Sequence, residues 1–213
     1  MRTRSLFRLV APSLALAALL AACTAGPEPL PPPDYAALRA EWDSLLIERD
    51  RLFESEASPL PDSARARFAG LAYFPYDTAH AHRIRLRPAL DRDTILMATS
   101  TGETRALVPY GLFRFEHGGR AHTLTAYEPI GPGPGGRLFI PFQDQTSGRA
   151  TYGGGRYLDL DESPDGVYAL DFNQAYHPYC VYNPIYSCPL PPSENRLDLA
   201  VTAGERLPDG YGS

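Results

Sequence analysis

The sequence predicts a mainly β protein, an antiparallel barrel or sandwich with one amphipathic helix at the N-terminal end of its domain. After Tyr73 the chain consists of short runs in which polar and apolar residues alternate, separated by Gly, Pro and Asp, which is typical of antiparallel strands. Before them lies one long stretch, 34–56, without Pro or Gly. No internal repeat or second boundary divides 34–213, so we expect a single domain with its own core.

The stretch 34–56 is expected to form the helix, because its apolar residues recur at steps of three and four. Asp34 can cap its first turn. A stripe at this spacing usually packs on its own domain, and we expect that role here. A second short helix is expected within 63–70. The stripe consists of Leu38, Trp42, Leu45, Leu46, Arg49 and Phe53.

The clearest strand signal is a hairpin in which LFRFEH and RAHTLT flank Gly118 and Gly119. Two glycines between alternating runs suit a tight primed turn. This register places Phe115 opposite His122 and Phe113 opposite Leu124. Further strands are expected at 83–87, 94–99, 104–110, 138–142, 156–160 and 167–172.

The N-terminal residues have the features of an export signal. Three arginines within the first eight residues precede an apolar run over 9–22, which is too short to span a membrane. The following Leu-Ala-Ala-Cys resembles the lipobox of bacterial lipoproteins. We therefore expect 1–22 to be a cleaved signal peptide and Cys23 to carry the lipid anchor. Thr24 after the cysteine resembles the sorting pattern for the outer membrane, facing the periplasm.

The chain from Cys23 onward is acidic. It holds 25 Asp and Glu against 17 Arg, a net charge of −8, and the sequence has no Lys. Nucleic acid is therefore a poor partner. The Pro-rich segment 23–33 cannot build a core, and we expect it to be an extended stalk between the anchor and the domain at 34–213.

Four sequence words carry a family resemblance: GLAYFPYD at 70–77, FQDQTSGRATYGGGRYLDL at 142–160, LDFNQAYHPYCVYN at 170–183 and CPLPPSENRL at 188–197. In this order they resemble a family of uncharacterised bacterial proteins, domain of unknown function 1684 (DUF1684). The similarity extends over most of 34–207. It implies that these words form the core of the domain, and it implies no activity and no cofactor.

Two cysteines remain in the domain, Cys180 and Cys188. In an oxidising compartment we expect them to form a disulfide. The alternative is a metal site that includes His177, but such a site needs a further ligand at a suitable spacing and none is adjacent. His80 and His82 alternate on one expected strand and offer a second two-histidine set. We expect packed or exposed histidines there, and His122 as a core histidine, so no metal site is predicted.

A dense group of polar residues in the family words is the candidate ligand-binding site. It could be a structural ion-pair network, or a polar pocket for a polar or anionic ligand. Gly153, Gly154 and Gly155 do not make a phosphate loop, because a strand follows them; unusual backbone angles or close packing explain them better. The group consists of Tyr152, Arg156, Asp171, Asn173, Tyr176, Glu194, Asn195 and Arg196.

Arg156 and Asp171 are expected to form an ion pair on one face of a hairpin. Positions 156, 158 and 160 share a face, as do 167, 169 and 171. Antiparallel pairing through the turn at 163–164 would place Arg156 opposite Asp171 and Leu158 opposite Ala169.

Two functions follow as hypotheses. The first is a membrane-anchored lipoprotein that binds a small ligand or an envelope protein, since no G-x-S-x-G or H-E-x-x-H motif occurs. The second is an envelope hydrolase with Asp171 and Glu194 as its acid and base. A structural role in the envelope is a third possibility.

Overall fold

The computed structural model describes residues 29–130 and 136–208. The expected signal peptide 1–22, Cys23 and the first part of the stalk lie outside the described residues. Residues 29–34 have no regular secondary structure. In the described ranges no helix has the length and apolar character needed to cross a membrane.

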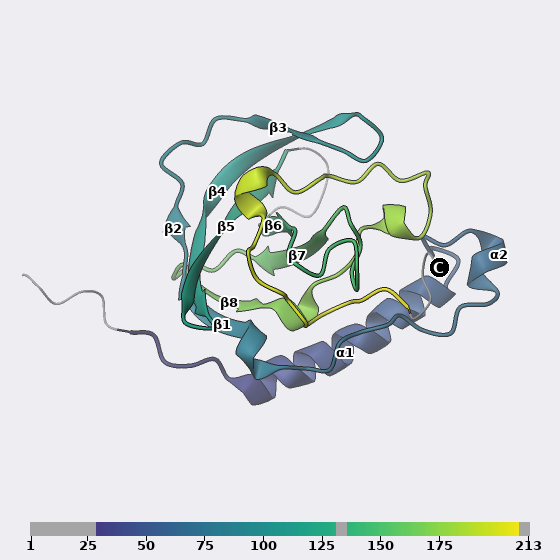
Figure 1. The fold of residues 1–213 in the computed structure, drawn as a ribbon, viewed down its shortest axis with the longest axis horizontal. Helices are drawn as coiled ribbons and strands as arrows, with labels where there is room; N and C mark the ends of the chain where they lie inside the picture. Colours follow the sequence, from purple (N-terminus) through teal and green to yellow (C-terminus); the bar gives the residue numbers. More distant parts are fainter. Residues whose placement is uncertain (1–28, 131–135, 209–213) are drawn as a thin grey trace, which may run out of the picture. The chain divides into compact units, whose positions relative to one another are not determined.

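Helix α1 (Tyr35–Glu54) confirms the long helix expected from the sequence (Figure 1). The Asp34 carboxylate accepts hydrogen bonds from the N–H groups of Ala36 and Ala37, at 3.1 and 3.0 Å, and so caps the first turn. The stripe packs inward, with Leu38, Trp42 and Phe53 buried. The second helix, α2 (Asp62–Arg65), is shorter than expected.

Among the described residues eight strands follow, and all of them except the two-residue β2 lie at or close to predicted positions. They are β1 (Ala81–Arg85), β2 (Arg87–Pro88), β3 (Ile95–Ala98), β4 (Thr104–His117), β5 (Arg120–Pro129), β6 (Arg137–Phe142), β7 (Arg156–Asp161) and β8 (Val167–Asp171). Short 3₁₀ turns lie between them and after them: η2 (Thr78–His80), η3 (Phe172–Gln174), η4 (Tyr179–Val181) and η5 (Ser193–Asn195). The stretch 104–117, expected as two runs, is one strand with a register shift between Pro109 and Gly111.

The hairpin of β4 and β5 has the predicted register. Phe115 faces His122 and Phe113 faces Leu124. Gly118 and Gly119 have φ angles of 57° and 74°, the left-handed conformation that a type I′ turn requires and that glycine adopts at little cost.

The strands form two antiparallel sheets. One has the order β2-β4-β5-β6-β7 with β3 also paired to β4, and the other consists of β1 and β8. Side chains from both sheets meet in one core that includes Phe113, Leu124, Ile140, Leu158 and Leu170. The predicted fold class is confirmed as mainly β with one long N-terminal helix. Within the described ranges the arrangement is sandwich-like, and the strands do not close into a barrel.

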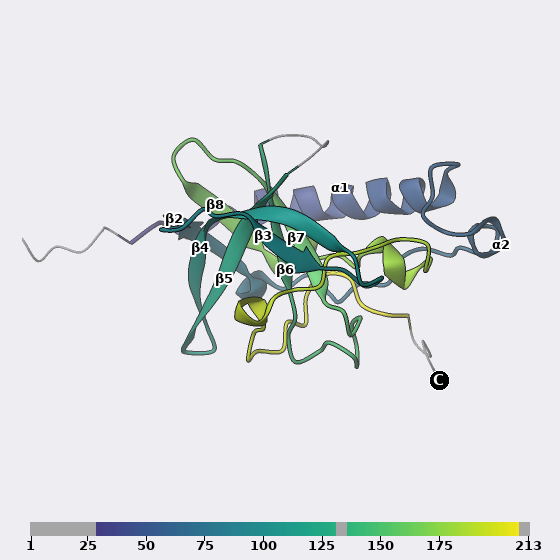
Figure 2. The same ribbon diagram turned by 90° about the horizontal axis from the view of Figure 1, so that it is seen from above.

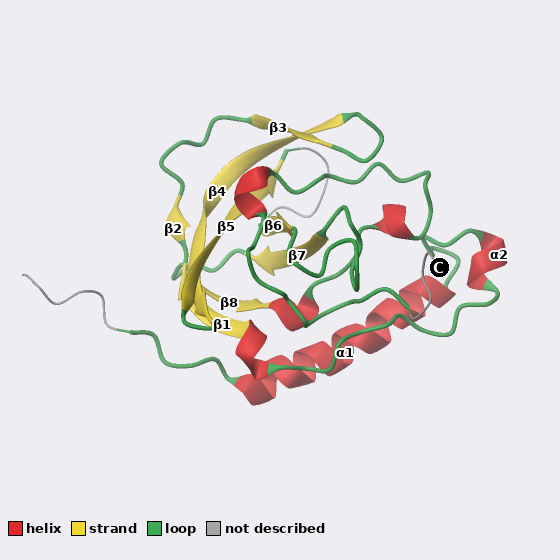
Figure 3. Ribbon diagram, viewed as in Figure 1, coloured by secondary structure: helices red, strands yellow, loops and turns green. Residues whose placement is uncertain are grey.

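Much of the core is covered by chain that belongs to neither sheet. Figure 2 shows the same ribbon from above, and in Figure 3 long loops (green) join β6 to β7 and continue from β8 toward the C-terminus. Within 196–207, Val201, Ala203 and Glu205 are fully buried although the segment has no strand. Helix α1 contacts η3, the turn that follows β8.

Candidate functional site

Arg156 opens β7 and is fully buried, with no exposed side-chain surface. Its guanidinium donates to the carboxylate of Asp144 at 3.0 Å and to the carbonyl of Val201 at 2.8 Å. It also donates to the carbonyls of Ala203 and Glu205. Burial lowers the pKa of Arg156, and the Asp144 carboxylate opposes that shift. The carbonyls of the buried C-terminal segment need hydrogen-bond donors, and no strand of the described ranges pairs with this segment. The guanidinium of Arg156 supplies those donors instead.

The expected pairing of Arg156 with Asp171 is wrong. Strand β7 pairs with β6, so Arg156 lies opposite Phe142 and Leu158 lies opposite Ile140. Strand β8 pairs with β1, which places Asp171 opposite Ala81. The turn between β7 and β8 therefore crosses from one sheet to the other. Because Arg156 is sealed in the core, it does not line an open pocket for an anion.

Asp171 and Asn173 tie the end of β8 to the chain before β1. The Oδ1 atom of Asp171 accepts from the backbone N–H and the side-chain amide of Asn173, at 2.9 and 2.7 Å. Asn173 in turn bonds both backbone groups of Asp77, each at 2.9 Å. Asp171 is 1% exposed, and its Oδ2 atom has no hydrogen-bond partner among the described residues.

The electrostatics of Asp171 connect it to α1. Burial is the main cause that raises its pKa, and the Glu41 carboxylate on α1 raises it further. The hydrogen bonds from the backbone N–H and the side-chain amide of Asn173 oppose the rise. Glu41 and Gln174 are therefore the neighbours of this buried carboxylate on its α1 side.

The residues around η5 form a separate scaffold. The Asn195 side chain bonds the N–H and carbonyl of Thr125 on β5, at 2.7 and 2.9 Å, and the carbonyl of Pro141 on β6 at 2.7 Å. Glu194 accepts from the hydroxyl of Tyr127 at 3.0 Å. Since Asp171 and Glu194 take part in different networks, the geometry does not assemble them as a catalytic acid and base.

The remaining members of the predicted group are dispersed as well. Arg196 is exposed and donates to Gln143 at 3.2 Å. Tyr176 donates to Asp159 at 2.7 Å. The backbone N–H of Tyr152 donates to Nε2 of His177 at 3.2 Å. The eight predicted residues thus hold several parts of the scaffold together.

A buried triad that sequence reasoning missed joins α1 to the C-terminal segment. Glu205, fully buried, lies 3.0 Å from Arg49 of α1 and 3.3 Å from Nδ1 of His177. Because Nε2 of His177 already accepts from Tyr152, this histidine has no lone pair available for a nucleophile. Only the place of Arg49 on the helix stripe signalled a buried role; Glu205 follows no periodic pattern.

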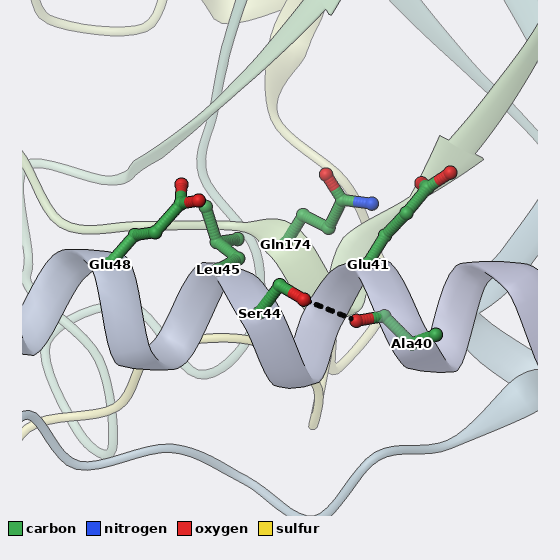
Figure 4. A pocket seen from close by; sticks show the side chains of 6 residues that line it. All are labelled: Ala40, Glu41, Ser44, Leu45, Glu48 and Gln174. Carbon is green, nitrogen blue, oxygen red and sulfur yellow. Dashed lines mark hydrogen bonds between the residues drawn. The ribbon is translucent and has the colours of Figure 1, made fainter.

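An open groove runs along α1 (Figure 4). Its volume is about 420 Å³. In Figure 4 the side chains of Glu41 and Gln174 lie on the same side of the helix, and Glu48 lies on that side about two turns further along, beyond Leu45. The groove is lined by Ala40, Glu41, Ser44, Leu45, Glu48 and Gln174.

Two aromatic residues, Trp42 and Tyr76, pack together, and Tyr76 lies near Asp171 and Glu41. The Trp42 ring is 5.4 Å from the ring of Tyr76, and the Arg39 guanidinium lies over both. Burial raises the pKa of Tyr76 to about 12, and the Asp171 carboxylate contributes to the rise. In the part of the chain that the structure describes, the indole N–H of Trp42 and the hydroxyl of Tyr76 are buried without hydrogen-bond partners.

Four of the five histidines meet at the β4–β5 hairpin. The rings of His80 and His117 stack with their centroids 4.6 Å apart. The ring centroids of His82 and His122 lie 4.9 and 5.5 Å from that of Phe115. Burial lowers the pKa of His80, and it lowers that of His82 to about 4. Across the described ranges no three His, Cys, Asp or Glu side chains are arranged to hold a metal ion.

Comparison with known proteins identifies the family. The family model described as protein of unknown function (DUF1684) matches residues 66–206. The solution NMR structure of an uncharacterised protein from Haloarcula marismortui is 34% identical, covers 82% of this chain and 96% of its own, and superposes with a TM-score of 0.66. A search of curated proteins found no match. The chain therefore belongs to the DUF1684 family of proteins of unknown function.

Proposed function

We propose that the chain is an exported lipoprotein whose β-rich domain binds a small polar ligand with a positive charge, in the groove between α1 and η3. The observation that carries the ligand proposal is the buried Oδ2 atom of Asp171. It has no hydrogen-bond partner within 29–130 and 136–208, and Asp171 neighbours Glu41 and Gln174 of that groove. Buried carboxylate oxygens are normally hydrogen-bonded, so a donor from a ligand would satisfy this one.

The charge of the groove selects the ligand class. Glu41 and Glu48 are the charged side chains that line it, and neither Arg156 nor Arg196 contributes. An ammonium or guanidinium group near Glu41 would be attracted, whereas an anion would be repelled. The net charge of −8 from Cys23 onward also favours a cationic ligand. A ligand of this class replaces the anionic ligand considered from the sequence.

A direct binding measurement tests the ligand proposal. We expect 1,4-diaminobutane to bind the full-length chain in detergent, as followed by calorimetry, and Glu41→Gln to weaken binding about tenfold, equivalent to about 1.4 kcal/mol. Asp171→Asn should weaken it as well. Glu54→Gln, at the exposed end of α1, is the matched control and should bind as the unmodified chain does. Preference for succinate over the diamine, or equal binding by all variants, would contradict the proposal.

The anchor is the second part of the proposal, and it rests on the signal and the cysteine that follows it. In a cell with two membranes we expect the protein in the outer membrane, facing the periplasm. Cys23→Ser should abolish incorporation of labelled palmitate and leave the signal peptide attached, because the thiol that receives the lipid is lost. Labelling that persists in this variant would show that Cys23 is not the attachment site.

A further inference from the structure

The two cysteines of the domain lie against each other across a short loop. Cys180 is at the centre of η4, and its backbone N–H donates to the sulfur of Cys188 at 3.2 Å. Both are free thiols in the structure, so the disulfide expected from the sequence stays a prediction. Their exposures differ: Cys180 is partly exposed and Cys188 is buried.

Cys188 is fixed to the turn that joins β3 to β4. Its N–H donates to Oγ of Ser100 at 3.1 Å, and its carbonyl accepts from the N–H of Ser100 at 2.8 Å. The neighbouring Ser187 hydroxyl donates to Thr99 at 2.8 Å. The buried sulfur is therefore held in place by backbone bonds on both sides.

The other end of the loop is fixed to α1 and the chain after it. Tyr182 packs edge-on against Phe53 with ring centroids 4.8 Å apart, and the Asn183 amide donates to the carbonyl of Pro59 at 3.2 Å. The Cys180 sulfur lies 3.9 Å from the hydroxyl of Tyr152. The fold thus holds one accessible and one buried thiol together without requiring the bond between them.

We propose that Cys180 and Cys188 are a redox-active dithiol, in which Cys180 reacts with an external disulfide and Cys188 resolves the product. This role goes beyond a permanent cross-link. The partly exposed Cys180 can meet a partner, while the buried Cys188 sulfur accepts a hydrogen bond from the backbone N–H of Cys180. The partner class is a low-molecular-weight or protein disulfide.

The exchange balances in two steps. The Cys180 thiolate attacks one sulfur of the external disulfide, which breaks that bond, forms a mixed disulfide and releases one thiolate. Cys188 loses its proton and attacks the Cys180 sulfur, which forms the Cys180–Cys188 disulfide and releases the second thiolate. The two released thiolates take up one proton that Cys180 gave to solvent when its thiolate formed and one from Cys188. Two electrons and two protons thus pass from the cysteine pair to the external disulfide.

The charges around the pair support this division of roles. The hydrogen bond with Cys188 is the main cause that lowers the pKa of Cys180 to about 6, and the Tyr152 hydroxyl contributes despite the opposing effect of burial. The same bond and burial raise the pKa of Cys188. Cys180 is therefore a thiolate at neutral pH, while Cys188 keeps its proton and donates it in a hydrogen bond to the Cys180 sulfur. Since thiolates are the reactive form of cysteine, Cys180 is the attacking residue.

The first test measures the reactivity of each thiol in the reduced full-length chain, extracted in detergent. We expect iodoacetamide to alkylate Cys180 at least tenfold faster than Cys188, with a half-maximal rate near pH 6, as read by peptide mass spectrometry. Equal rates, or a half-maximal rate near the ordinary cysteine pKa of about 8.5, would overturn the assignment.

The second test uses oxidised glutathione as the external disulfide. The unmodified chain should release two glutathione thiols and form the Cys180–Cys188 bond, which excess dithiothreitol should reverse. Cys188→Ser should trap glutathione on Cys180, whereas the matched Cys180→Ser should trap none on Cys188. A bond that resists the reductant without denaturation, a pair that stays reduced, or trapping on Cys188 would each overturn the proposal.

Discussion

Arg156→Ala is expected to destabilise the folded chain by about 3–5 kcal/mol. The change leaves the Asp144 carboxylate, itself 1% exposed, without its cation inside the core. It also leaves the carbonyls of Val201 and Ala203 without their donor, and each unsatisfied buried group adds its own cost. Denaturant unfolding of the full-length chain measures the loss.

Arg120→Ala is the matched control. Arg120 pairs with Asp198 at 2.9 Å, but both side chains are about two-thirds exposed, at 68% and 66%. Water and salt screen such a pair, so its removal should cost less than about 1 kcal/mol. Similar losses for Arg156→Ala and Arg120→Ala would contradict the buried role of Arg156.

Double-mutant cycles separate the observed partner of Arg156 from the one expected from the sequence. Arg156→Ala and Asp144→Ala should couple by roughly 1–3 kcal/mol, because each change removes the partner of the other. Arg156→Ala and Asp171→Ala should be additive within about 0.5 kcal/mol, because the two residues lie in different networks. Coupling between Arg156 and Asp171 without coupling between Arg156 and Asp144 would contradict the observed strand pairing.

The sequence predicted the parts of the fold that local rules govern. Alternation and the Gly118–Gly119 turn predicted the register of β4 and β5. The spacing of apolar residues predicted the position of α1 and its buried face. Both signals lie within one element or one hairpin, where a period and a turn type are sufficient.

The partner of β7 could not be predicted in this way. RLFIPF at 137–142 and VYALDF at 167–172 both offer a face for β7, and alternation does not distinguish them. The turn at 162–166 looks like a hairpin turn but crosses between the sheets. The sequence pattern therefore predicts pairing of β7 with β8, whereas the observed partner is β6. The predicted ion pair between Arg156 and Asp171 is wrong for the same reason.

The candidate groove was also beyond sequence reasoning. Glu41 and Glu48 look like ordinary exposed helix residues, and Gln174 lies in a short turn more than a hundred residues later. Only the packing of α1 on η3 brings them together beside Asp171. The predicted list contained Asp171 but assigned it to the wrong network.

Gly155→Ala is expected to destabilise the chain by about 3 kcal/mol or more. Gly155 has a φ angle of 91°, which costs a residue with a side chain roughly 1–2 kcal/mol. An added Cβ would also lie 2.5 Å from the carbonyl oxygen of Phe142, a backbone atom of the paired strand β6. Since that strand cannot withdraw without breaking its ladder with β7, overpacking adds about 1–3 kcal/mol.

Gly153→Ala provides the matched control within the same glycine run. A Cβ at Gly153 would have its nearest contact at 3.6 Å, an ordinary van der Waals distance, and Gly153 does not have a positive φ angle. Gly153→Ala should therefore lower the free energy of unfolding by no more than about 1 kcal/mol. Thermal or denaturant unfolding of the two variants compares them directly. Equal losses would show that the run is uniformly tolerant or uniformly strained. A loss confined to Gly155→Ala would show that this glycine is required where the turn enters β7, immediately before the buried Arg156.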